Sequence, residues 1–183
     1  FEHLGVYACR ILVPGMSEIY PIDDLEWENN SNGAAVRPAI LNLAELDDDQ
    51  CTQLLDLLNE LNIAEERPVA ALIGLAPDAG SIWADLRVGE LKAMLALAVG
   101  DTDAVLEGCE WVRQFDQLDA DRRRIYRCIA TLLEMADPNA CEDALVSLYG
   151  EETLDMATDL IDGEVRFFGL VSPGLALEGC DLH

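Results

Sequence analysis

Basic residues are scarce in this 183-residue chain, and the scarcity limits the partners that it can bind. Lys92 is its only lysine, and eleven Lys and Arg residues stand against 36 Asp and Glu residues, for a formal net charge of -25. A surface of this charge repels nucleic acid and anionic membranes, so neither is expected as a partner. The chain also lacks any apolar run close to the ~18 residues that a membrane-spanning helix requires.

Clustered metal ligands are missing as well. The six cysteines are spread along the chain without a C-x-x-C pair, and the two histidines, His3 and His183, lie at its ends. A zinc site requires thiolates and imidazoles that lie close together, so no metal site is expected. Dispersed cysteines are typical of reduced, buried side chains, and we therefore expect a cytoplasmic protein.

One apolar strand is expected near the start of the chain. Residues 5–13 are mostly β-branched, aromatic or aliphatic on both faces, and Pro14 and Gly15 end the segment. A strand that is apolar on both faces belongs inside a sheet, yet most of the remaining sequence has a helical pattern. Since Phe1 is not an initiator methionine, we expect the chain to begin inside a larger protein that supplies the rest of the sheet.

Helical periodicity dominates the remainder. Asp47, Asp48 and Asp49 suit the first turn of a helix, where free N–H groups favour anions. Apolar residues then recur at helical spacing over residues 86–99, 101–115, 119–136, 138–149 and 151–161. Gly108, in the middle of one such segment, predicts a closely packed neighbouring helix, because a missing side chain lets two backbones approach.

Two apolar segments have a different pattern. Residues 68–75 fit either a buried strand or a short buried helix. Residues 164–170 predict a strand that returns to the sheet of residues 5–13. The sequence therefore predicts a mainly α fold of two degenerate tetratricopeptide-like helical hairpins, with a small flanking β element from the N- and C-terminal strands.

Several short motifs, in order along the chain, resemble the YcaO family. They are residues 11–21 (ILVPGMSEIYP), 40–43 (ILNL), 72–74 (LIG), 89–92 (GELK), 162–170 (DGEVRFFGL) and 177–179 (LEG). The resemblance places the end of a catalytic core at 1–25, a linker with a short helical segment at 26–46, a helical domain at 47–161, and a return strand with a tail at 162–183.

The resemblance also implies a function for the parent protein. YcaO-like enzymes depend on ATP and magnesium, and they phosphorylate a backbone amide oxygen so that a nucleophile can attack the carbon. The branch with a helical C-terminal extension is associated with methylthiolation of a small-subunit ribosomal protein, as an accessory factor. The glutamate-rich ATP motifs of the family have no match here, so no catalytic residue, cofactor site or metal site is assigned to this chain.

Four arginines form the one basic cluster of this acidic chain: Arg122, Arg123, Arg124 and Arg127. Helical spacing places Arg123 and Arg127 on one face, with Arg124 beside them. This pattern predicts a docking site for an acidic peptide or phosphate. The alternative is ion pairing with nearby acidic residues, namely Asp116, Asp119, Asp121 and Glu134.

Three functions are compatible with these patterns. The first is a non-catalytic interaction domain that binds its own upstream catalytic domain, a second copy of itself, or another protein or peptide. The second is a segment that completes the ATP or substrate site of the parent enzyme, through residues 13–20 or 177–183. The third is a free-standing helical adaptor, against which the unpaired strand at residues 5–13 argues.

Overall fold

A helix that is apolar on almost every side lies at the centre of the fold. The structure is a computed structural model that describes residues 33–75, 77, 80–115 and 117–172. The central helix, α6 (Val88–Val99), has nine buried residues, including Leu91, Met94 and Leu95. A helix that is apolar all round requires neighbours on several sides, and α6 has them.

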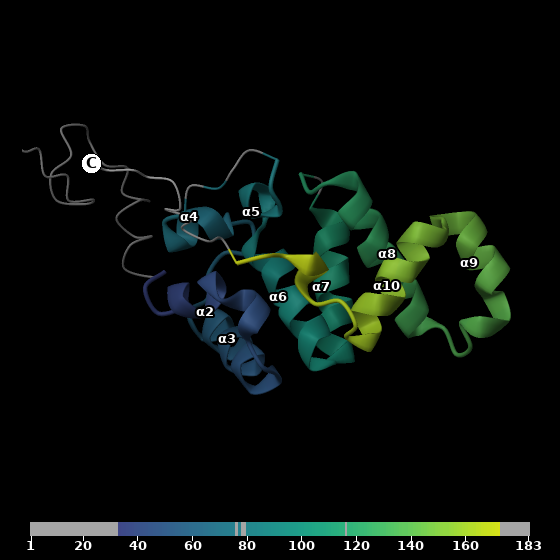
Figure 1. The fold of residues 1–183 in the computed structure, drawn as a ribbon, viewed down its shortest axis with the longest axis horizontal. Coiled ribbons are helices and arrows are strands. Elements are labelled where there is room, and N and C mark those ends of the chain that lie inside the picture. Colours follow the sequence, from purple (N-terminus) through teal and green to yellow (C-terminus); the bar gives the residue numbers. More distant parts are fainter. Residues whose placement is uncertain (1–32, 76, 78–79, 116, 173–183) are drawn as a thin grey trace, which may run out of the picture.

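One group of helices packs on one side of α6 and a second group packs on the other (Figure 1). The first group consists of α2 (Arg37–Leu41), η2 (Leu43–Glu45), α3 (Asp48–Glu60), α4 (Val69–Ile73) and α5 (Ile82–Asp85). The second group consists of α7 (Thr102–Gln114), α8 (Ala120–Glu134) and α10 (Glu151–Asp162). Leu91 and Leu95 of α6 face the first core, whereas Ala93 and Leu97 face the second.

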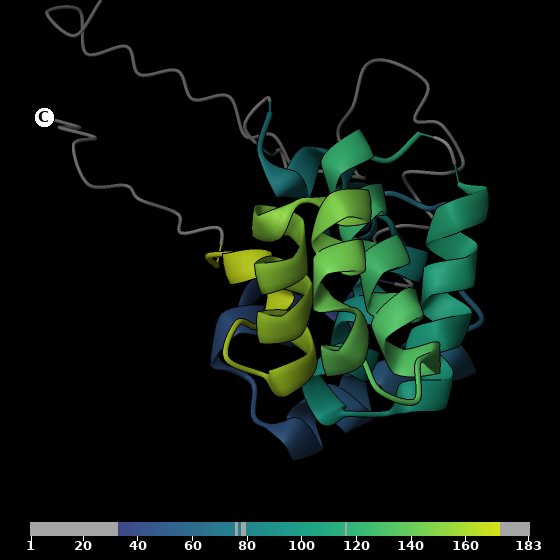
Figure 2. The same ribbon diagram turned by 90° about the vertical axis from the view of Figure 1, so that its right-hand side faces the viewer.

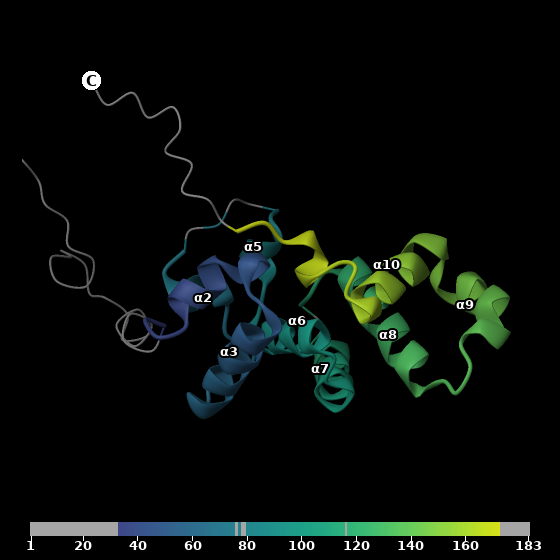
Figure 3. The same cartoon turned by 60° about the horizontal axis from the view of Figure 1, so that its bottom comes forward.

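Neighbouring helices pack in sequence, with α3 on α6, α6 on α7, α7 on α8, and α8 on α10. A short η3 turn (Asn139–Cys141) and α9 (Glu142–Tyr149) connect α8 to α10. These three helices form the end of the molecule that Figure 2 shows face-on, and Figure 3 shows α9 standing outermost. The prediction of a mainly helical fold is confirmed, whereas the likeness to tetratricopeptide hairpins stays a prediction.

Local capping sets the helix ends predicted near Asp47, Gly100 and Asp101, and the structure confirms these three. The helix predicted over residues 138–149 begins instead with a 3-10 turn, and α9 starts at Glu142. The Asp47 carboxylate accepts a hydrogen bond from the Gln50 backbone N–H (2.8 Å), and the Gln50 side chain accepts one from the Asp47 N–H (3.0 Å). Gly100 ends α6 in the left-handed conformation, at φ 71°, and Asp101 then caps α7. Such caps satisfy backbone groups that a helix end leaves without a partner.

The Asp47 cap gives a first testable prediction. Asp47→Ala is expected to lower the free energy of unfolding by about 1 kcal/mol, because the Gln50 N–H loses its acceptor. The measurement is urea denaturation followed by circular dichroism. Asp49→Ala is the matched control, because Asp49 lies in the same first turn without forming the capping box. Equal losses in the two variants would show that charge near the helix N-terminus, not the cap, sets the effect.

The segment after α10 corrects one prediction. Residues 164–170 do not form a strand, because Phe167–Gly169 form a single turn of 3-10 helix, η4. Phe167 and Phe168 both have positive φ, at 53° and 55°, a conformation that extended strands exclude. The bend lets Phe167 enter the first core while Phe168 packs against Tyr126 of α8, with the ring centroids 5.4 Å apart.

Arg166 fixes this bent segment to the first group of helices. Its Nη1 donates a hydrogen bond to the Leu46 carbonyl (2.9 Å), and its Nη2 donates to Asp48 (3.2 Å). The guanidinium also lies over the Phe167 ring, 5.5 Å from the centroid. An alternating strand could not direct two consecutive phenylalanines into the interior together, so tertiary contacts here override strand propensity.

Two further predictions concern apolar segments. Residues 69–73 form the short buried helix α4, so the helical alternative for residues 68–75 is the correct one. The predicted strand at residues 5–13 lies outside the described residues, as do residues 13–20 and 177–183. No helix in the described part of the chain combines the length and apolar character needed to cross a membrane.

Candidate functional site

The arginine cluster lies on α8, which begins at Asp119. The Asp119 carboxylate accepts hydrogen bonds from the backbone N–H groups of Asp121 (3.0 Å) and Arg122 (3.1 Å). These hydrogen bonds, the one from Arg122 foremost, lower the pKa of Asp119. A stable cap at this position fixes where each following side chain of α8 points.

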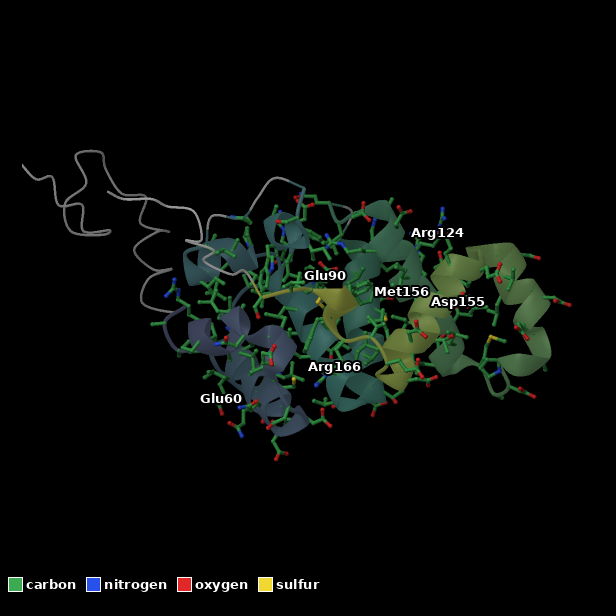
Figure 4. The ribbon with its side chains drawn as sticks, in the orientation of Figure 1. Glu60, Glu90, Arg124, Asp155, Met156 and Arg166 are labelled. Atoms are coloured by element: carbon green, nitrogen blue, oxygen red, sulfur yellow. The ribbon has the colours of Figure 1, made fainter. Side chains whose placement is uncertain are left out.

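The four arginines do not share one environment. Arg122 is buried and faces α6, Arg123 is half-buried, and Arg124 and Arg127 are exposed. Figure 4 shows Arg124 extending outward from α8. We call the three arginines other than Arg122 the arginine row. None of its side chains forms an ion pair with an acidic residue that the structure describes, so the predicted surface ion pairs are not seen with Asp119, Asp121 or Glu134. The fourth predicted partner, Asp116, lies outside the described residues.

Arg122 instead pairs with a carboxylate inside the protein. Its Nη1 lies 3.6 Å from Oε2 of Glu90 on α6, and the Glu90 side chain has no exposed surface. That distance exceeds a hydrogen bond, and both Glu90 oxygens lack a hydrogen-bond partner among the described residues. Glu90 therefore interacts with Arg122 through charge alone.

Burial dominates the ionisation of Glu90. Desolvation raises its pKa from 4.5 to about 7, although Arg122 opposes the shift, and the negative charges of Asp85 and Asp119 add to it. Glu90 is thus poised between its charged and neutral forms near neutral pH. Figure 4 shows Glu90 in the interior of the helix array, away from the exposed Arg124.

Tyr126 completes this internal polar cluster, which we define as Glu90, Arg122 and Tyr126. The ring of Tyr126 is 1% exposed, and its hydroxyl has no hydrogen-bond partner among the described residues. Burial raises its pKa well above 10, and the negative charge of Glu90 adds to the effect. Because all three side chains are closed off from solvent, the cluster has no surface on which a substrate could bind.

The described residues include many acidic side chains and four free thiols. They contain no group of three or more His, Cys, Asp or Glu side chains arranged to hold a metal ion. Cys51, Cys109 and Cys128 are buried free thiols, and Cys141 is an exposed one. Burial raises the pKa of Cys109 to about 12 and that of Cys128 to about 11, so neither is a reactive thiolate at neutral pH.

The sequence pattern does not by itself reveal the role of Glu90. The residue appeared only within the motif of residues 89–92, with no function attached. A signal was present, because Glu90 and Lys92 are the only charged residues in the otherwise apolar helix α6. Lys92 is accounted for by an ion pair with Glu65, at 3.6 Å, which leaves Glu90 as the charge that requires an internal partner.

Comparison with known proteins identifies the family. Residues 33–183 match the family model of the YcaO cyclodehydratase C-terminal domain. The chain is 42% identical to the ribosomal protein S12 methylthiotransferase accessory factor YcaO of Escherichia coli (strain K12), over 93% of this chain and 30% of the relative. It is 35% identical to an uncharacterized protein of Haemophilus influenzae, over 93% of this chain and 31% of that protein.

Both relatives are much longer than the chain, which spans under a third of their length. The matched region of the family model contains all the helices described above, from α2 to α10. The chain therefore belongs to the YcaO family and contains its C-terminal domain.

Proposed function

We propose that this chain is a non-catalytic interaction domain of a longer, cytoplasmic YcaO-family protein. One observation carries the proposal: a chain of net charge -25 presents an arginine row on α8 that pairs with no acidic residue in the described part of the structure. Arg124 and Arg127, the two exposed members of the row, are suited to bind a carboxylate or phosphate group of another molecule, because neither forms an ion pair with a described residue.

The family gives this binding a biological setting. The E. coli relative is named an accessory factor of ribosomal protein S12 methylthiotransferase. We propose that the chain positions partners for an ATP- and magnesium-dependent catalytic core elsewhere in the longer protein. The partners would be that core, a second copy or another acidic protein, and the parent reaction would assist methylthiolation of a ribosomal protein.

The arginine row gives the second prediction. Arg124→Glu combined with Arg127→Glu, made in the longer protein, is expected to weaken self-association, because the row would then repel acidic surfaces. Light scattering over a range of concentrations measures the effect. Arg113→Glu is the matched control, because Arg113 is an exposed arginine on α7 that already pairs with Glu110 at 2.6 Å.

Two results would contradict the proposal. If the control variant weakens self-association as much as the double variant, net charge and not the arginine row determines the outcome. If the chain on its own turns over ATP, the non-catalytic role is wrong and completion of an ATP site becomes the better account. A wild-type protein that stays monomeric at every concentration would remove the second copy from the list of partners.

A further inference from the structure

A groove of about 650 Å³ opens between α8, α9 and α10, at the end of the molecule that faces the viewer in Figure 2. Its apolar lining includes Leu132 and Leu133 of α8, Leu145 of α9, and Leu154 and Ile161 of α10. A groove of this size with leucine and isoleucine on three helices suits the apolar face of a short helix. The arginine row does not line it.

Acidic side chains border this apolar lining. Glu142 of α9 and Asp155, Asp159 and Asp162 of α10 also line the groove, and no basic residue does. Figure 4 labels Asp155 on the ribbon of α10. The surrounding sequence strengthens this field, because residues 128–165 contain ten Asp and Glu residues and no Lys, Arg or His. The groove is therefore lined by both apolar and acidic side chains, and the sequence that surrounds it is acidic.

Helix α9 is incompletely covered by the rest of the protein. Leu145 is its only buried residue, whereas Leu148 is 69% exposed and Val146 is 37% exposed. Neither side chain lines the groove itself, but large apolar side chains that stay exposed on a helix are characteristic of surfaces that another molecule covers. Figure 3 shows α9 as the outermost helix of this end.

We infer that this groove binds a basic amphipathic segment of a partner protein. Apolar residues of the segment would contact the leucines, and its lysines or arginines would lie against Glu142, Asp155, Asp159 and Asp162. Charge complementarity favours this occupant over a second copy, which also has a net charge of -25. It also argues against the chain's own residues 173–183, which include Glu178 and Asp181 but no Lys or Arg.

The inference extends the interaction role to a second surface and does not depend on the arginine row, so each can fail without the other. The test uses two labelled synthetic helical peptides with the same leucine face, one carrying lysines on its other face and one carrying glutamates. Fluorescence anisotropy measures the binding of each to the full chain at two salt concentrations. We expect the lysine peptide to bind, more weakly at high salt, and the glutamate peptide not to bind.

Two pairs of variants locate the binding. Thr158→Trp would fill the groove, and Thr52→Trp is its control, because each threonine is exposed in a helix and donates to the carbonyl four residues earlier at 2.9 Å. Asp155→Asn with Asp159→Asn removes two charges beside the groove, and Asp49→Asn with Asp56→Asn removes two from α3. The groove variants are expected to weaken lysine-peptide binding by about tenfold, and the controls by less than about twofold.

Three results would overturn the inference. Equal binding of the two peptides would show that charge does not select the occupant. Equal weakening by the α3 control variants would show that the lysine peptide follows overall charge and not the groove. A drop in the mass of the protein in light scattering, caused by Thr158→Trp but not by Thr52→Trp, would assign the groove to a second copy.

Discussion

Glu90→Gln is expected to stabilise the protein at about pH 8 and to remove a loss of stability that the wild-type protein shows as pH rises. Glu90 is fully buried in α6, and its pKa in the folded protein is raised to about 7 from 4.5. The raised pKa means that the folded protein releases the Glu90 proton less readily than the unfolded chain does. Glutamine resembles the protonated side chain and never has to ionise.

The direction of the effect follows from proton binding. Between pH 4.5 and about 7 the unfolded chain has released this proton while the folded protein still holds it. The contribution of Glu90 to stability is therefore complete below pH 4.5, falls as pH rises through this window, and is constant above it. A shift of this size corresponds to about 3 kcal/mol, so Glu90→Gln should gain about that much over the wild-type protein across the window.

Urea denaturation at a series of pH values measures this difference. Subtracting the wild-type curve from the Glu90→Gln curve cancels the general repulsion among the many acidic residues, because both proteins share it. The facing groups Arg122, Asp85, Asp119 and Tyr126 are also common to both. The prediction is contradicted if the difference in stability does not change with pH, or if Glu90→Gln is less stable than the wild-type protein at pH 8. Either result would mean that the attraction between Glu90 and Arg122 exceeds the cost of burying the Glu90 charge.

Arg122→Met is the complementary control for the same pair. Without the guanidinium, ionised Glu90 has no positive charge within the core, so the variant is expected to lose stability at about pH 8. At about pH 5 Glu90 is already protonated in the folded state, and the loss should largely disappear. Opposite pH dependences in the two variants would show that Glu90 and Arg122 act as a pair.

The features predicted from sequence are those that neighbouring residues determine. Asp47 and Asp101 accept hydrogen bonds from backbone N–H groups three residues further on, and Gly100 ends α6 by adopting a left-handed conformation. Because these effects are local, the three helix ends could be placed without knowledge of the fold. The resemblance to the YcaO family was also correct, because residues 33–183 match the family model of its C-terminal domain.

The features that sequence did not predict depend on contacts between distant segments. Glu90 and Arg122 meet only because α6 and α8 both contribute to the second core, which no local pattern predicts. Residues 164–170 have the composition of a strand, yet Phe167 and Phe168 enter the interior together through a bend. The groove combines residues of α8, α9 and α10, so no single helix pattern predicts it, although the absence of basic residues over 128–165 already indicates an acidic surface.

Gly108 provides the second large effect, at the contact between α6 and α7. A Cβ atom at Gly108 would lie 2.5 Å from the Cβ of Ala93, closer than real Cβ contacts allow, and 3.0 Å from its Cα, which is tighter than most of them. Gly108→Val is therefore expected to separate the two helices and lower the free energy of unfolding by about 3 kcal/mol. Glu107→Val is the control, because it places the same β-branched side chain at an exposed position of the same helix.

A double-mutant cycle distinguishes this steric effect from a change in helix propensity. Gly108→Ala improves the propensity of α7 by about 1 kcal/mol, so a variant without a clash would be more stable than the wild-type protein. We expect it to be less stable, and Ala93→Gly to recover part of the loss because the Ala93 Cβ is the atom that blocks the new methyl group. The two changes should therefore couple by about 1 kcal/mol. If the stability changes of Gly108→Ala and Ala93→Gly simply add, the two side chains do not clash. The close approach of α6 and α7 would then not depend on a glycine at position 108.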